Sequence, residues 1–329
     1  MDARISALLG GLFDYAGLFP PAGLEMRETV RNYASYRAGP HARMLGRLVV
    51  PWNRRREFLD ALADVRTNAS TESSTGNSVD ASAGDGADGI GACPVTMLIP
   101  LPDGADEVDR LRREHADFSE AAVGHVKIGA LESRADAPDR LEGLPETFDL
   151  FGELFPDAEI HVEATESCPV EELLDALVAE RDRTGRGAGK LRTGSVVPEE
   201  IPPVDEVVRF IRACARRDLP WKATAGLHHP LPATRALTYE ADSPEGPMYG
   251  YLGVILAAAR SLEDPPAPAS DLRKLLTDPE TPDLSAFSTT SIRTARTRGC
   301  LSIGSCSFIE PVEDARSLGL LSNSNASST

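Results

Sequence analysis

Short apolar segments alternate with amphipathic segments along most of the chain. The apolar segments cover residues 47–51, 95–100, 125–129, 159–164, 189–194 and 221–226. The segments between them carry apolar residues at helical spacing, as in residues 54–65, 146–154, 169–180 and 204–217. Six successive strand and helix units of this kind predict a parallel sheet covered by helices.

The alternation continues less regularly after residue 231. Residues 249–261 and 271–276 have helical patterns, 284–289 is a weak strand candidate, and 300–308 is a stronger one. With both candidates accepted, the chain has eight strands, the number in a closed barrel. The sequence therefore predicts a single α/β domain, a (β/α)8 barrel of the TIM type with an N-terminal helical cap. An open doubly wound parallel sheet is the alternative.

Two segments lack the apolar residues of a packed core. Residues 67–92 are rich in Ser, Thr, Asn, Asp and Gly, and 321–329 have a similar composition. We expect 1–320 to form the barrel domain, with 67–92 as a disordered low-complexity loop and 321–329 as a disordered tail. The GDGADG run at 84–89 has no strand before it and no helix after it, so it does not predict a dinucleotide site, and no cofactor is expected.

Composition narrows the classes of partner. The 329 residues carry a formal charge of -17, which argues against nucleic acids and anionic membranes as partners. The five cysteines form no CxxC motif, and no run of about 20 apolar residues or signal-peptide pattern is present. These features predict a soluble, cytoplasmic protein, and they are compatible with a homo-oligomer. A small anionic substrate is expected on other grounds, from the charged residues of the predicted strands.

Lysine is scarce and unusually placed. Only four of the 34 basic residues are lysines, and three of them, Lys127, Lys190 and Lys222, fall in predicted strands. A buried lysine can lose its proton and act as a base or nucleophile, whereas arginine stays charged. The alternative reading is that these lysines form buried ion pairs.

Strand alternation places an ionisable set inside the predicted barrel. If the apolar residues face the helices, the inward set is His125, Lys127, His161, Glu163, Lys190, Arg192, Lys222 and Thr224. This set contains four Lys or Arg side chains against one carboxylate. Uncompensated buried charge is costly, so the pattern predicts an anionic ligand or a depressed lysine pKa.

Roles follow from this set. We expect Lys222 to be the nucleophile, Lys190 to lower its pKa, and Glu163 or His161 to move protons. An ordinary core histidine is the alternative for His161. The expected substrate-binding residues lie at the carboxyl ends of strands or in adjacent loops, and they are Arg192, Lys127, His228, Thr224, Ser305 and Asp14.

Two other functions remain open at this stage. A metal-dependent hydrolase could use His161, Glu163 and His228, although the nearby cations would repel a divalent ion, so no metal ligands are assigned. A non-catalytic binder of an acidic metabolite is the second alternative.

The segments that carry these residues resemble known proteins. FDYAGLFPPA at 13–22, KLRTG at 190–194, KATAGLHHP at 222–230 and GSCSF at 304–308 resemble a family of uncharacterised bacterial proteins. More loosely, the two lysine strands are similar to class I (Schiff-base) aldolases of the deoxyribose-phosphate type. In those enzymes one lysine forms the Schiff base and the other tunes it. This resemblance implies an aldolase, lyase or isomerase, with the lysines on the fifth and sixth predicted strands.

Overall fold

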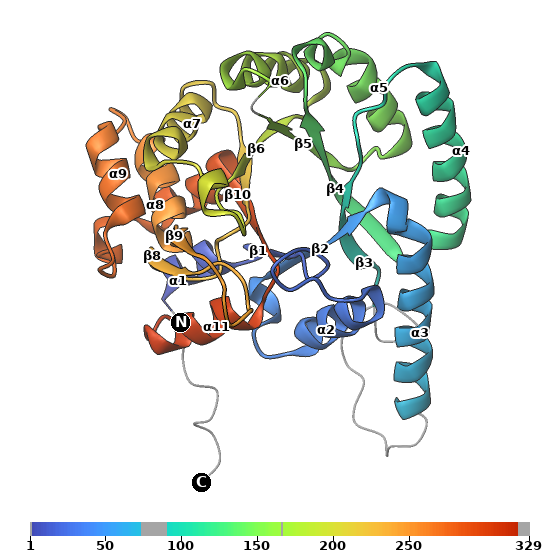
Figure 1. Ribbon diagram of the computed structural model, residues 1–329, viewed down its shortest axis with the longest axis horizontal. Coiled ribbons are helices and arrows are strands. Elements are labelled where there is room, and N and C mark those ends of the chain that lie inside the picture. Colours follow the sequence, from blue (N-terminus) through green and yellow to red (C-terminus); the bar gives the residue numbers. More distant parts are fainter. Residues whose placement is uncertain (1, 74–90, 166, 322–329) are drawn as a thin grey trace.

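Eight parallel strands close into a barrel in the computed structural model, which describes residues 2–73, 91–165 and 167–321 (Figure 1). The strands are β1 (Phe13–Tyr15), β2 (Leu45–Pro51), β3 (Cys93–Leu98), β4 (Val126–Ala135), β5 (Glu159–Ala164), β6 (Ala188–Arg192), β7 (Trp221–Thr224) and β10 (Cys300–Ser305). β1 pairs with both β2 and β10, which closes the ring. The predicted (β/α)8 barrel is confirmed, and the open-sheet alternative is wrong.

The first barrel strand is not where the sequence pattern placed a strand. β1 has only three residues and lies in the FDYAGLFPPA segment, ahead of the first predicted strand at 47–51. The weak candidate at 284–289 is instead a 3-10 turn, Leu284–Ala286, followed by the helix α10 (Thr289–Thr294). The count of eight strands is therefore right, but one of the predicted strands is wrong.

Helices surround the barrel on its outer side, as Figure 1 shows. They are α1 (Ala3–Leu9), α2 (Met26–Ala38), α3 (Arg55–Ser73), α4 (Ala105–Ala122), α5 (Leu144–Leu154), α6 (Val170–Thr184), α7 (Val204–Arg216), α8 (Tyr251–Ser261), α9 (Ala269–Thr277), α10 and α11 (Ile309–Ser317). Shorter helical turns are Ala42–Met44, Trp52–Arg54, Pro138–Leu141, Pro198–Glu200 and the π-helical Ala295–Gly299. Outward-facing strand residues such as Ile160, Val162 and Trp221 are buried beneath these helices.

The helix α8 is almost entirely internal. Every residue of α8 except Arg260 is buried. Gly253 lets α9 approach closely, because a Cβ at this position would lie 2.1 Å from the carbonyl oxygen of Leu275. α8 therefore fills the layer between the barrel and α9, and this packing explains why its pattern is apolar on all sides.

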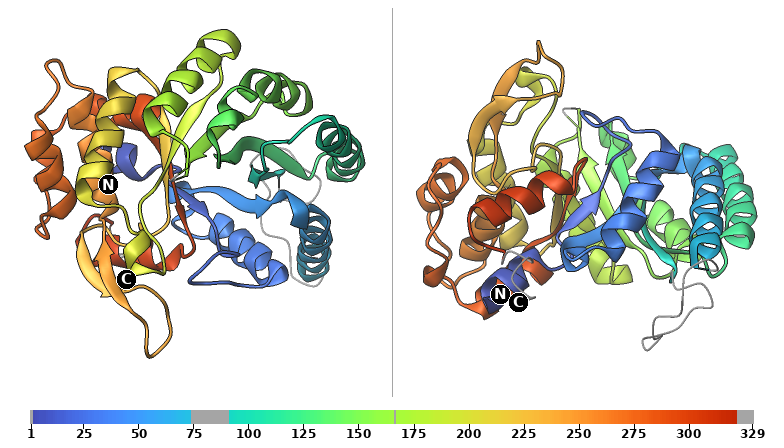
Figure 2. Two further views of the ribbon diagram at one scale, coloured as in Figure 1. Left: turned by 45° about the horizontal axis from the view of Figure 1, so that its top comes forward. Right: turned by 90° about the horizontal axis from the view of Figure 1, so that it is seen from below.

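An antiparallel hairpin follows β7 and was not predicted. Its strands are β8 (Ala233–Ala236) and β9 (Glu245–Met248). The right view of Figure 2 shows it projecting beyond the barrel. Tyr249, directly after β9, donates a hydrogen bond of 2.7 Å to the carbonyl oxygen of Pro202 and so joins the hairpin to the segment before α7.

The expected loop at 67–92 begins later than predicted, because α3 continues to Ser73. Residues 74–90 of that loop and 322–329 of the expected tail lie outside the described residues. None of the helices in the described part of the chain is both long and apolar enough to cross a bilayer.

Candidate active site

A cavity of about 450 Å³ opens at the carboxyl ends of the barrel strands. Its walls include Glu163, Lys190, Arg192 and Thr224 from strands β5 to β7. The loop after β1 contributes Phe19 and Pro21, and the hairpin contributes Met248. In (β/α)8 enzymes this end of the barrel is the one that carries the active site.

A chain of alternating charges crosses the barrel interior and reaches the cavity wall through Glu132, Lys190 and Glu163. Lys222 Nζ lies 2.7 Å from Asp14 Oδ2 and 2.6 Å from Glu132 Oε1. Lys190 Nζ lies 2.9 Å from Glu132 Oε2 and 2.9 Å from Glu163 Oε2. Five charges from five strands are thus joined by hydrogen-bonded contacts, and each lysine is held between two carboxylates.

Asp14 is fixed by further contacts at the buried end of this chain of charges. Its Oδ1 accepts a hydrogen bond from the backbone N–H of Arg47, and its Oδ2 accepts one from the Ser302 hydroxyl. The neighbouring Gly46 leaves room for the carboxylate, because a Cβ there would lie 2.4 Å from Oδ1. Asp14 is 1% exposed and is absent from the described walls of the cavity, so the structure does not bring it to the cavity surface.

A β-bulge in β4 places Glu132 on the inward face of the barrel. β4 pairs with β3 through Ile128 opposite Val95 and then Ala130 opposite Thr96, so Gly129 is an extra residue. One inserted residue exchanges the two faces of a strand for everything that follows it. Lys127 and Glu132 consequently share one face of β4, but Lys127 is exposed at the amino end of the strand, whereas Glu132 is buried farther along it. The structure therefore does not bring Lys127 to the carboxyl-end cavity, because of its position along the strand and not because of its face.

The lysines are stabilised in their charged form. Burial by itself disfavours the ammonium of Lys222, but Asp14 and Glu132 outweigh burial and raise the pKa of Lys222 to about 12. Burial likewise opposes the charge of Lys190, and Glu132 and Glu163 raise its pKa. The expectation of a depressed lysine pKa is wrong, because it counted one carboxylate where the structure has three.

The carboxylates between these lysines are shifted in the opposite direction. Burial raises the pKa of a carboxyl group, but the two ammonium groups outweigh it and lower the pKa of Glu132. The pKa of Asp14 is lowered in the same way, mainly by Lys222 against the effect of burial. The interior therefore holds ion pairs, as the alternative reading of the lysines expected.

His161 lies in the same interior but does not reach the cavity walls. It is 2% exposed, and its Nδ1 has no hydrogen-bond partner among the described residues. Burial first, and then the charge of Lys222, lower the pKa of His161 to about 3. The ring is thus neutral and enclosed, which matches a core histidine and not the expected proton carrier.

Two arginines form the cationic rim of the cavity. Arg134 Nε lies 3.8 Å and Arg192 Nε 4.0 Å from Glu163 Oε1. Their side chains are 61% and 47% exposed, so both are available to a ligand. The five interior charges sum to one negative charge, and these arginines turn the balance positive at the cavity.

The glycines of the KLRTG and KATAG motifs bring two loops together beneath the cavity. A Cβ on Gly194 would lie 2.7 Å from the Cα of Gly226, which itself has a φ of +74°. Thr193 Oγ1 donates hydrogen bonds to the carbonyl oxygens of Thr224 and Ala225. The motifs therefore fix the loops after β6 and β7 against each other, and Thr224 lies in the cavity wall as expected.

The loop after β10 places Cys306 in the cavity and Ser305 away from it. Cys306 and Gly304 line the cavity. The Ser305 hydroxyl instead donates a 2.6 Å hydrogen bond to the carbonyl oxygen of Ser307 and is 2% exposed. The structure therefore does not bring the Ser305 hydroxyl to the cavity that the sequence assigned to substrate binding.

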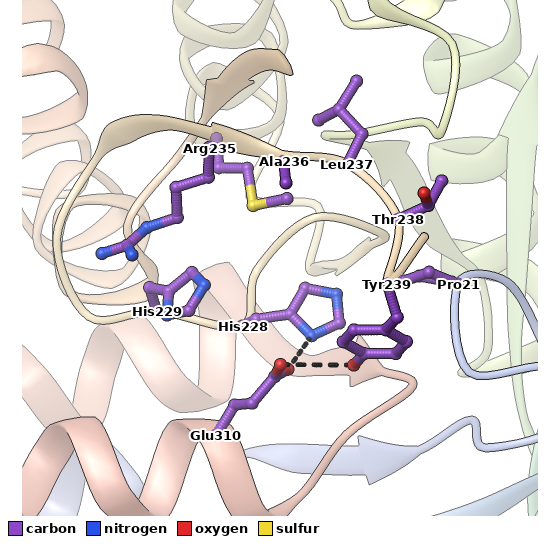
Figure 3. Close-up of a pocket in the computed structure, with 10 residues that line it drawn as sticks. Pro21, His228, His229, Arg235, Ala236, Leu237, Thr238, Tyr239 and Glu310 are labelled. Carbon is purple, nitrogen blue, oxygen red and sulfur yellow. Dashed lines mark hydrogen bonds and ion pairs between the residues drawn. The ribbon is translucent and has the colours of Figure 1, made fainter. Parts of the chain in front are cut away.

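His228 belongs to the walls of two cavities. Besides the carboxyl-end cavity, it lines a second one of about 390 Å³ together with His229, Tyr239 and Glu310 (Figure 3). His228 Nδ1 lies 2.9 Å from Glu310 Oε2, and Tyr239 donates a hydrogen bond of 3.2 Å to the same carboxylate. His229 pairs with Asp314 at 2.6 Å. Of the two adjacent histidines, only His228 is in the carboxyl-end cavity.

The structure does not support a metal site built from His161, Glu163 and His228. Across residues 2–73, 91–165 and 167–321, no three His, Cys, Asp or Glu side chains are grouped as a metal site requires. Glu163 is paired with Lys190, and His228 is paired with Glu310. The three residues named for a metal-dependent hydrolase are therefore not brought together.

The similarity of this chain to known proteins is limited to its fold. No protein-family model matches the chain, and no curated protein matches it. Among solved structures, a deoxyribose phosphate aldolase from Aeropyrum pernix, described as tetrameric, is similar in fold. Its TM-score is 0.46 at 13% identity, over 96% of this chain and 98% of that chain. We draw neither activity nor assembly from a similarity this low, and the barrel rests on the strand pairing above.

Sequence reasoning missed Glu132, Arg134, Tyr239 and Glu310. Glu132 and Arg134 alternate with Leu131 and Ser133 in the part of β4 beyond Gly129, where the strand was thought to end. The two charged residues at alternate positions, Glu132 and Arg134, were therefore a detectable feature. Tyr239 and Glu310 come from a loop and a helix that only the tertiary fold brings to His228.

Proposed function

We propose that the protein is a lysine-dependent enzyme of the aldolase or lyase type, acting on a small anionic carbonyl compound in the carboxyl-end cavity. The observation that carries this proposal is the position of Lys190. Its ammonium group lines the cavity, lies between Glu132 and Glu163, and shares Glu132 with the buried Lys222. Paired lysines of this kind at the carboxyl end of a barrel suit Schiff-base chemistry.

Lys190 is the better nucleophile of the two, which exchanges the roles expected from the sequence. Lys222 is 0% exposed and does not belong to the described lining of the cavity. Lys190 is 8% exposed and belongs to that lining. Lys222 then acts on Lys190 through Glu132. Because Lys222 also binds this carboxylate, Glu132 stabilises the ammonium form of Lys190 less than an unshared carboxylate would. In barrel order the pair lies on the sixth and seventh strands and not on the fifth and sixth, because β1 precedes the first predicted strand.

The chemistry requires Lys190 to lose one proton before it attacks. Glu163 is the group that accepts it, since its Oε2 is 2.9 Å from Nζ and it also lines the cavity. The neutral amine then adds to the carbonyl carbon to give a carbinolamine. Glu163 returns its proton to the carbinolamine hydroxyl, which leaves as water and gives the protonated, positively charged imine. The positively charged imine withdraws electrons from the adjacent carbon, which is what carbon–carbon cleavage or enolisation needs.

Arg134 and Arg192 are proposed to select the anionic group of the substrate. Both guanidinium groups lie near Glu163 Oε1 at the cavity rim and are half-exposed or more. A guanidinium group binds carboxylate or phosphate through two parallel hydrogen bonds. A substrate anion at this rim places its carbonyl over Lys190.

Non-catalytic binding of an acidic metabolite is the second candidate. It is favoured by the full pairing of both lysines, because an ammonium held between two carboxylates is a poor nucleophile. The same rim arginines would hold the ligand. Covalent trapping separates the two candidates.

The test is reduction of the imine with borohydride during incubation with glyoxylate, pyruvate or glyceraldehyde 3-phosphate. The native protein is expected to gain the mass of the reduced adduct at Lys190, located by peptide mass spectrometry. Lys190→Arg keeps the charge, removes the nucleophile and should abolish the adduct. Lys127→Arg is the matched control, because Lys127 is exposed outside the cavity.

Each outcome decides between the candidates. Labelling of Lys222 would return the roles to those expected from the sequence. A carbonyl ligand that binds at the rim but labels neither lysine would reject the Schiff-base proposal in favour of binding alone. If Arg192→Gln then folds normally but no longer binds this ligand, the arginine rim is the binding site of the ligand.

A further inference from the structure

Cys306 and His228 lie against each other in the cavity wall, on the side opposite to the charged strands β4 to β6. Cys306 Sγ is 3.7 Å from His228 Nε2 and 3.9 Å from His228 Nδ1. Both residues line the carboxyl-end cavity. Their separation in the sequence, 78 residues, explains why no pattern in the sequence links them.

Glu310 orients the imidazole ring. Its Oε2 lies 2.9 Å from His228 Nδ1, so Nδ1–H donates to the carboxylate and Nε2 remains for the thiol. Tyr239 OH donates to Glu310 Oε1 and holds the carboxylate from its other side, as Figure 3 shows. A nucleophile, a histidine and an orienting acid in this order form the arrangement that activates a weakly acidic nucleophile.

The groups around the ring favour its protonated form. Burial disfavours the imidazolium, but the hydrogen bonds with Cys306 and Glu310 outweigh burial and raise the pKa of His228 to about 10. A cationic imidazole next to a thiol stabilises the thiolate, and the thiolate is the reactive form of cysteine. His229 lies on the other side, where Asp314 and Arg235 face it.

The other four cysteines provide an internal comparison. All five thiols are buried. Burial raises the pKa of Cys93 and of Cys300 to about 12, and it also raises the pKa of Cys168 and Cys214. Among the described residues, Cys306 combines a histidine neighbour with a place in a cavity wall.

We infer that Cys306, His228 and Glu310 form a second nucleophilic site in the cavity, which takes small aldehydes as reversible covalent ligands. The sulfur of Cys306 forms a bond to the carbonyl carbon, and the carbonyl π electrons move to the oxygen. That oxygen takes the proton that His228 Nε2 received from the thiol, so the product is a neutral hemithioacetal. This site is independent of Lys190, because its chemistry uses Cys306, His228 and Glu310 and no amine.

The test begins with the rate of alkylation by iodoacetamide at pH 7, followed for each cysteine by peptide mass spectrometry. In the native protein Cys306 is expected to react at least about tenfold faster than the other four thiols. His228→Asn should remove that advantage, whereas His229→Asn should leave it within about twofold, because His229 does not contact Cys306. Glu310→Gln should give an intermediate rate. In urea all five thiols should react alike in every variant.

The aldehyde step is tested in Lys190→Arg, where no amine of Lys190 can interfere. Glyoxylate should slow the alkylation of Cys306, and dialysis should restore it. Glycolate has the same carboxylate without the carbonyl and should have little effect. The inference is overturned if Cys306 reacts no faster than the other thiols, if the two histidine variants behave alike, or if glycolate protects as well as glyoxylate.

Discussion

Glu132 and Lys222 make a 2.6 Å ion pair that joins β4 to β7 across the barrel interior. These strands are not neighbours in the barrel. The other oxygen of Glu132 binds Lys190, so one carboxylate connects both lysines. We therefore regard Glu132 as the centre of the interior charges, which makes it the first residue to test.

Glu132→Gln should lower the stability of the protein strongly. The substitution removes one negative charge and leaves two buried ammonium groups with weaker partners, and breaking a buried ion pair costs about 3–5 kcal/mol. Denaturant unfolding should show this loss as a lower midpoint. Glu120→Gln on the exposed face of α4 is the control and should change the unfolding free energy by less than about 0.5 kcal/mol. Equal effects of the two substitutions would contradict the structure.

The unfolding free energy should decline at both ends of the pH scale, because buried carboxylates are protonated at low pH and a buried lysine loses its proton at high pH. The lowered pKa values of Asp14 and Glu132 give stability that is present above about pH 4 and is lost as the pH falls through their folded values. The raised pKa of Lys222 gives stability that is complete below about pH 10.4 and is lost as the pH rises toward about 12. Unfolding free energies measured from pH 3 to 11 should therefore be highest in the middle of this range.

Imine formation should accelerate with pH. The pKa of Lys190 is raised by Glu132 and Glu163 against the effect of burial, so at pH 7 only a small fraction is neutral amine. The rate of borohydride trapping should rise about tenfold per pH unit through the neutral range. Glu163→Gln removes one of the two carboxylates and should move this rise to lower pH by about 1–3 units, with a lower maximum because the proton acceptor is lost. A flat profile in the native protein would contradict a charged Lys190.

The repeated strand and helix pattern was enough to predict the barrel. The strands that carry Lys190 and Lys222 were also placed correctly, because apolar neighbours fix which face of each strand is inside. The three-residue strand β1 could not be predicted from this pattern. A strand so short has no detectable alternation, and it is stabilised by pairing with β2 and β10, which are distant in the sequence.

The charge balance of the site could not be predicted for a different reason. The single extra residue Gly129 moves the residues after it to the other face of β4, so the unnoticed anion Glu132 points inward. The inferred cation Lys127 lies at the amino end of the strand, where it is exposed. A composition count cannot detect one inserted residue. The pairing of Cys306 with His228 was equally hidden, since it depends on how two loops meet at the end of the barrel.

Gly194→Ala tests whether the loops after β6 and β7 must touch. A Cβ at Gly194 would lie 2.7 Å from the Cα of Gly226, and backbone atoms at such a contact cannot move aside as a flexible side chain can. We expect a loss of about 1–3 kcal/mol in unfolding free energy, because overpacking displaces the backbone. The same displacement shifts Thr224 and Gly226 in the cavity wall, so ligand binding at the rim should weaken as well.

Gly143→Ala is the matched control for this substitution. Its Cβ would meet nothing closer than the carbonyl oxygen of Arg140, at 4.0 Å, and its φ of -89° suits alanine. Replacing glycine with alanine here should change the unfolding free energy by less than about 1 kcal/mol, because the entropy lost by the unfolded chain is opposed by the preference for glycine at the N-cap of α5. If Gly194→Ala is tolerated as well as this control, the two loops do not contact each other in the way described, and the KLRTG and KATAG glycines need another explanation.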